Sequence, residues 1–183
     1  MRCTAAIALV LLVATPVAAL AHFDLVDPVS RYETTLFGRP CGQDPDTGRA
    51  NETTLSAGST ITLRWTSTIS HPGHFRISFD EDGQDFSVPA SPDDLYTDSN
   101  VVADDIPGLS DDPNRSFSLA LPDIECDNCT IQLLQVLTDH LPYTTDGNTD
   151  DLHWQCADVI LVRDGVFHDG FEREPERRET ASE

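Results

Sequence analysis

His22 could bind metal in a way that other histidines cannot, provided that the chain is cut in front of it. Residues 1–21 hold an early arginine, an apolar run and the small-residue ending Ala19-Leu20-Ala21, which is the pattern of a secretory signal peptide. Cleavage after Ala21 would give His22 a free α-amine beside its imidazole. One residue would then offer two nitrogens to the same metal ion.

Two more histidines are expected to reach the same place. His71 lies at a Pro-Gly turn just before a predicted strand, and His153 begins the last predicted strand. Both can project from one end of a β-structure, where an N-terminal residue can also reach. An amine and imidazoles together form a nitrogen-rich ligand set, which suits copper(II) in tetragonal geometry. His22, His71 and His153 are therefore the predicted metal ligands and catalytic residues.

Four cysteines remain after cleavage, because Cys3 leaves with the signal peptide. An even number in an exported chain favours two disulfides. Zinc on four thiolates would normally need two close pairs, and only Cys126 and Cys129 are close in sequence. Oxidised cysteines supply no thiolate, which disfavours a blue-copper site. The Cys126-x-x-Cys129 spacing also leaves open a redox dithiol, although no thioredoxin-like βαβ pattern surrounds it.

Composition indicates an exported, strongly acidic domain. The 183 residues include 32 acidic side chains and 11 basic ones, all arginine, for a formal net charge of −21. Such a charge disfavours nucleic acid and anionic membranes as partners. The apolar run of the signal is too short to span a bilayer, and no later segment comes close. We expect a monomeric, secreted or periplasmic domain over residues 22–166 and a charged, disordered tail over 167–183.

Short strands separated by turn signals predict an all-β fold. The expected strands are residues 60–66, 75–80, 86–88, 116–121, 130–138 and 153–162. The expected irregular segments are an extended lead-in over 22–32, a loop held by Cys41 over 39–51, and an acidic surface loop over 89–114. Without an amphipathic helix, these elements predict an antiparallel immunoglobulin/fibronectin-III-like β-sandwich with long loops.

The first half of the mature sequence resembles lytic polysaccharide monooxygenases. These proteins open on histidine and soon reach a Pro-x-Ser-Arg type segment, which HFDLVDPVSR at residues 22–31 matches. The segment FGRPCG at 37–42 is similar to their Pro-Cys-Gly loop. The segment HPGHFRISFDEDGQDF at 71–86 is similar to the region around their second histidine.

The second half carries the most specific likeness. HWQCADV at residues 153–159 is similar to the last strand of the bacterial chitin- and cellulose-active members. NCTIQ at 128–132 resembles a strand of related extracellular copper proteins. The matched segments together span about residues 22–162, which is nearly the whole mature domain.

The resemblance implies a copper site. It makes His22 and His71 the histidine brace, in which copper takes the His22 amine and both imidazoles. It places His153 where the family has phenylalanine or tyrosine beside the metal. An imidazole there could become a further nitrogen ligand, favour copper(II) and slow reduction.

Other roles follow from the same resemblance. It implies disulfides between Cys41 and Cys156 and between Cys126 and Cys129. Three residues are expected to support the metal ligands, namely His74, Gln155 and Asp158. His74 is also a second candidate for the brace, and Asp158 could equally be a solvent-facing strand residue. His140 is a weaker supporting candidate, and no role is expected for His168.

The implied function is a secreted copper-dependent monooxygenase that cleaves polysaccharide with an external electron donor. A non-catalytic copper-binding protein is the alternative, and His153 in the aromatic position favours it. A third hypothesis is an exported sandwich that displays a carbohydrate-binding or adhesive surface. Calcium at residues 80–83 (DEDG) is less favoured, because the segment lacks the ligand spacing of an EF-hand loop.

Overall fold

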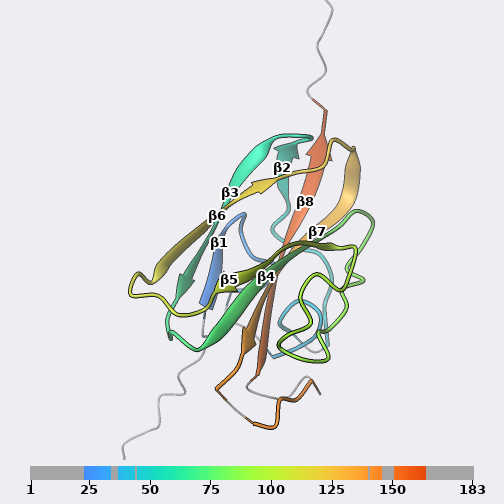
Figure 1. The fold of residues 1–183 in the computed structure, drawn as a ribbon. Coiled ribbons are helices and arrows are strands. Elements are labelled where there is room, and N and C mark those ends of the chain that lie inside the picture. The colour runs from blue at the N-terminus through green and yellow to red at the C-terminus, as the bar shows by residue number, and fades with distance from the viewer. Residues whose placement is uncertain (1–22, 34–36, 44, 140, 146–150, 164–183) are drawn as a thin grey trace, which may run out of the picture.

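Two β-sheets pack face to face in the computed structural model (Figure 1), which describes residues 23–33, 37–43, 45–139, 141–145 and 151–163. The strands in chain order are β1 (Phe23–Asp27), β2 (Thr53–Ser56), β3 (Thr60–Ser67), β4 (Gly73–Asp80), β5 (Val101–Pro107), β6 (Asn114–Ala120), β7 (Cys126–Leu137) and β8 (Leu152–Val162). No helix in these ranges is long and apolar enough to cross a membrane. The expected signal peptide and tail lie outside the described residues.

The small sheet has the strand order β1-β3-β6, and the large sheet has the order β2-β8-β7-β4-β5. All neighbouring strands are antiparallel except β2, which runs parallel to β8. Because β4 and β8 are both antiparallel to β7, they run in the same direction. Both therefore begin at the same end of the large sheet (Figure 1).

The large sheet is covered on both faces. Its inner face, toward the small sheet, contributes Phe75, Ile131 and Val159 to the main core. Its outer face carries a second apolar cluster made of Leu134, Val136, Leu152 and Trp154. Strands buried on both sides need a nearly continuous apolar sequence rather than strict alternation. That requirement explains the composition of β7 and β8.

The predicted β-sandwich is confirmed, with β2 as its parallel exception. Five predicted strands correspond to β3, β4, β6, β7 and β8. The strand predicted at 86–88 is wrong, since this segment belongs to a loop. The loop predicted over 89–114 is also partly wrong, because it contains β5.

The sequence of β5 lacks the regular alternation that predicts a strand. Two adjacent aspartates break its alternation, Asp105 has a positive φ of 55°, and the register with β4 shifts twice. The short edge strand β2 was not predicted either. It has four residues and pairs only with β8.

Two disulfides fix the chain around β7 and β8. Cys41 is bonded to Cys156, with 4.9 Å between the Cα atoms, and ties a loop to the outer face of β8. Cys126 is bonded to Cys129 across a register shift in β7. These are the pairings that the resemblance implied, and they leave none of the four cysteines as a thiolate ligand.

Candidate metal centre

His153 is buried near the start of β8, on the inner face of the large sheet. It pairs across strands with Gln135 of β7, and Gln135 pairs in turn with Phe75 of β4. Residues paired in this way share one face of a sheet. The ring of Phe75 packs against Phe23 and Trp65 of the small sheet, with centroid distances of 5.4 and 5.2 Å. His153 is completely buried in this row.

Gln155 fastens the first strand to the last one. It stands two residues after His153 and therefore faces the same side, and its Oε1 accepts a hydrogen bond of 2.5 Å from the backbone N–H of Leu25. Burial raises the pKa of the neighbouring Asp24, and a hydrogen bond from Gln155 opposes that rise. The hydrogen bond between Leu25 and Gln155 holds β1 against the large sheet. Phe23, at the start of β1, lies against Phe75, which belongs to the same row as Gln135 and His153. His22 itself lies outside the described residues.

His71 stands two residues before β4, at the end of the sheet where His153 lies. Its Nδ1 is 2.7 Å from Oδ2 of Asp139, which follows β7. A carboxylate at Nδ1 holds the ring proton there and leaves the lone pair on Nε2. This pairing is the usual outer support of a histidine that binds metal through Nε2. We name this part of the molecule, with His71 and His153, the histidine end.

Phe37 connects His153 with the surface. The two ring centroids are 5.1 Å apart, with planes inclined at 66°. The Phe37 side chain is 41% exposed, whereas His153 is not exposed at all. The aromatic ring thus shields the imidazole from solvent. Sequence reasoning included Phe37 in a motif but assigned it no role.

His74 points to the other face of the sheet. It is adjacent to the inward-facing Phe75, and its Nε2 lies 3.3 Å from Oδ1 of Asp104. Asp104 also pairs with Arg76 at 2.8 Å. Burial lowers the pKa of His74, and the Asp104 carboxylate opposes this effect. His74 therefore belongs to a buried ion-pair cluster on the outer face, whereas the sequence led us to expect it among the supports of the metal ligands.

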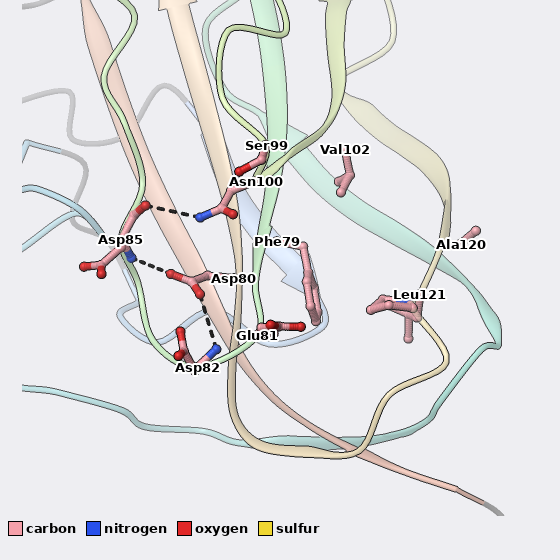
Figure 2. Close-up of a pocket in the computed structure, with 11 residues that line it drawn as sticks. Phe79, Asp80, Glu81, Asp82, Asp85, Ser99, Asn100, Val102, Ala120 and Leu121 are labelled. Atoms are coloured by element: carbon pink, nitrogen blue, oxygen red, sulfur yellow. Dashed lines mark hydrogen bonds between the residues drawn. The ribbon is translucent and has the colours of Figure 1, made fainter.

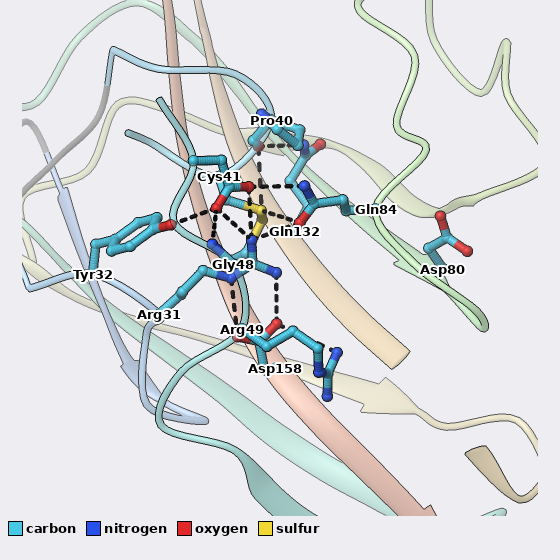
Figure 3. Close-up of a disulfide and its surroundings, with 12 residues drawn as sticks. Arg31, Tyr32, Pro40, Cys41, Gly48, Arg49, Asp80, Gln84, Gln132 and Asp158 are labelled. Atoms are coloured by element: carbon cyan, nitrogen blue, oxygen red, sulfur yellow. Dashed lines mark hydrogen bonds and ion pairs between the residues drawn. A yellow bond between two sulfur atoms is a disulfide. The ribbon is translucent and has the colours of Figure 1, made fainter. Parts of the chain in front are cut away.

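Asp158 is likewise on the outer face. It is fully buried, so the solvent-facing alternative is wrong. Its carboxylate accepts two hydrogen bonds from Arg31, at 2.9 and 2.6 Å (Figure 3). It accepts a third from the backbone N–H of Ala50 at 2.7 Å. Arg31 also pairs with Asp46. This cluster fixes the N-terminal loops on β8 on the face opposite to His153, whereas the sequence led us to expect Asp158 among the supports of the metal ligands.

The acidic turn after β4 lies beside an open cleft of about 590 Å³. Asp80 turns its carboxylate toward the backbone N–H groups of Asp82 and Asp85, at 3.2 and 2.5 Å (Figure 2). The acid thus stabilises the turn itself. Nowhere in the described ranges do three or more His, Cys, Asp or Glu side chains form a group that could hold a metal ion.

The two-sheet sandwich carries His71 and His153 at one end, and its disulfides occupy Cys41, Cys156, Cys126 and Cys129, so the side chains at this end offer nitrogen ligands, which suit copper(II). The family model described as lytic polysaccharide mono-oxygenase, cellulose-degrading, matches residues 26–159. This match covers more than half of the chain, which therefore belongs to the lytic polysaccharide mono-oxygenase family. Its members are copper-dependent oxidoreductases that act on polysaccharides with an external electron donor and are typically secreted. The predicted cofactor and enzyme class are confirmed at this level.

Two solved structures are similar to the chain. One is the AA15 lytic polysaccharide monooxygenase from Thermobia domestica in the Cu(I) state, at 16% identity and a TM-score of 0.43, covering 67% of this chain and 75% of that one. The other is the AA10 enzyme from Streptomyces lividans, at 15% identity and a TM-score of 0.43, covering 78% and 84%. No curated protein matches the sequence significantly.

Proposed function

We propose that this chain is a secreted monooxygenase that cleaves polysaccharide by oxidation at a copper ion held by His22 and His71, with His153 beside the metal. Family membership supports the reaction class. The observation that carries the site is the row of Phe75, Gln135 and His153. It brings the start of β1 to the end of the sheet at which His71 also lies.

The residues at the histidine end fit copper. The candidate donors are imidazoles and an N-terminal amine, and this ligand set suits copper(II). Asp139 supplies the outer partner that a metal-binding histidine requires. When bound, copper supplies the redox chemistry with oxygen or peroxide by which a C–H bond beside the glycosidic bond is oxidised.

The protein's own contribution is to hold these groups in place. Asp139 keeps the ring proton of His71 on Nδ1 and orients the imidazole. Gln155 fixes β1 through Leu25 and thereby limits where the N-terminal residue can lie. Phe37 keeps water from the ring of His153. The Cys41–Cys156 disulfide anchors the loop that carries Phe37 to β8.

Signal-peptide cleavage between Ala21 and His22 is part of the proposal. In the uncleaved chain the nitrogen of His22 is an amide and cannot bind metal as an amine does. The two disulfides agree with an oxidising compartment outside the cytoplasm. We propose that the mature protein works there as a monomer on an external polysaccharide.

A non-catalytic copper-binding protein is the second candidate. The observation that favours it is the buried imidazole of His153 in the position where the family has an aromatic ring. A third imidazole on the metal would stabilise copper(II) and slow its reduction. In this case the protein would bind copper tightly without turnover.

The deciding experiment uses the protein with an authentic His22 terminus. It is loaded with copper and given ascorbate together with cellulose, and chitin in a parallel assay. Oxidised oligosaccharides support the monooxygenase. Tight copper binding without products supports the second candidate, and the absence of copper binding contradicts both. The variant His153→Phe should give faster product formation than the wild type if the third imidazole restrains turnover.

A further inference from the structure

Gln135 is a buried glutamine with no evident structural role. Its side chain is not exposed at all, and neither Oε1 nor Nε2 has a hydrogen-bond partner among the residues that the structure describes. Its neighbours in sequence, Leu134 and Val136, are apolar and buried. Because buried polar groups are almost always paired in native proteins, an unpaired carboxamide at this position indicates a purpose other than packing.

The strand register places Gln135 directly across from His153. The two residues form a pair between β7 and β8 and share the inner face. The Cβ atoms of such pairs are about 4.5–5.5 Å apart, which is within reach of a carboxamide and an imidazole. On its other side Gln135 pairs with Phe75, which offers no polar atom in its side chain. His153 is therefore the polar side chain that faces Gln135 in this row.

A second buried glutamine on the same strand shows what a structural role looks like. Gln132 is 2% exposed and donates from Nε2 to the backbone oxygen of Pro40 at 2.8 Å. It stands an odd number of residues from Gln135 and so faces outward. Gln132 anchors the loop that carries Cys41, whereas the side chain of Gln135 makes no hydrogen bond within the described residues.

We infer that Gln135 is a positioning residue that turns His153 into a third imidazole ligand of the metal. In the copper-loaded protein its Oε1 accepts the hydrogen bond from one ring N–H of His153. The lone pair of the other ring nitrogen is then directed to copper. Histidines that bind metal nearly always donate their second N–H to such an acceptor. This inference rests on the proposed function, because it requires copper at the histidine end.

Phe37 completes the arrangement. Its ring lies against His153 and restricts the movement of the imidazole and the access of water. The carboxamide of Gln135 then faces His153 on one side and the apolar ring of Phe75 on the other. A hydrogen bond in such surroundings is stronger than one in water.

The test compares Gln135→Leu with Gln132→Leu in protein that begins at His22. Gln135→Leu should keep or raise the stability against urea, because it removes an unpaired buried group. It should weaken copper(II) binding, measured by chelator competition, by about 10–100-fold. Its copper(II) electron paramagnetic resonance spectrum should lose one nitrogen coupling. Gln132→Leu should lower the stability and leave the copper affinity and spectrum unchanged.

Gln135→Glu serves as the conservative variant. Its carboxylate can also accept from His153, so it should retain the spectrum that Gln135→Leu loses. The inference is overturned if Gln135→Leu has the affinity and spectrum of the wild type. Failure of the proposed function looks different, because then the wild type itself binds no copper and both ideas fall together.

Discussion

The two faces of β8 use buried polar groups in opposite ways. On the outer face, Asp158 receives three hydrogen bonds and forms an ion pair with Arg31. On the inner face near the strand's start, His153 stands beside Gln135, whose carboxamide has no partner in the described part of the chain. A fully paired network stabilises a fold, whereas a buried carboxamide that has no hydrogen-bond partner among the described residues can accept a hydrogen bond from a metal-binding imidazole.

This contrast separates two kinds of variants. Changes on the outer face should alter stability and leave copper binding unaffected. Changes at the histidine end should alter copper binding and have little effect on stability.

Asp158→Ala should have the largest effect. It removes one ion-pair partner of the buried Arg31 and leaves Asp46, and breaking a buried pair costs about 3–5 kcal/mol of unfolding free energy. Urea denaturation measures the loss. The matched control is Arg64→Ala, whose pair with Asp27 is exposed and contributes about 1 kcal/mol or less. The separation fails if Asp158→Ala remains stable, or if its folded form has a changed copper(II) spectrum.

Asp139→Asn should weaken copper binding and leave the stability of the fold nearly unchanged. The amide no longer holds the His71 ring as a carboxylate does, so copper(II) affinity should fall by about 10–100-fold in chelator competition. Both residues are partly exposed, and therefore the urea midpoint should hardly move. Equal copper affinities of the variant and the wild type would show that Asp139 does not orient a metal ligand.

His74→Gln should have the smallest effect, and only at acid pH. Burial lowers the pKa of His74 in the folded protein below its ordinary value of 6.5. The unfolded chain therefore binds a proton more readily, and stability should be lost as the pH falls through about 6.5, with a slope of at most about 1.4 kcal/mol per pH unit. The variant should lack this slope and keep the wild-type copper spectrum. A slope between pH 7.5 and 5.5 that is the same in both proteins would contradict this account.

The sequence predicted which segments form strands better than it predicted to which face of the sheet each side chain points. Alternation in β3 and β6 and the apolar runs of β7 and β8 were sufficient to predict four strands. The face to which His74 points depends on strand parity, and this follows from the pairing of its neighbour Phe75 with Gln135. From the sequence, Asp158 was equally consistent with a buried supporting carboxylate and with a solvent-facing strand residue, and only its burial against Arg31 excludes the second.

Gln135 and Phe37 could not be found from the sequence for a related reason. A glutamine in the run TIQLLQVL resembles Gln132 until the register assigns the two residues to opposite faces. The contact of Phe37 with His153 joins residues more than a hundred positions apart. No local pattern carries this kind of information, since it arises from the way the loop before Cys41 folds onto β8.

The central claim is that copper is held at the histidine end through the amine of His22. The most direct measurement compares copper(II) binding by protein that begins at His22 with binding by the same protein retaining Ala21. The account predicts that the extra residue, which turns the amine into an amide, weakens binding by more than about 100-fold, or about 2.7 kcal/mol, and removes the amine nitrogen from the spectrum. Equal affinity and identical spectra for the two proteins would contradict it.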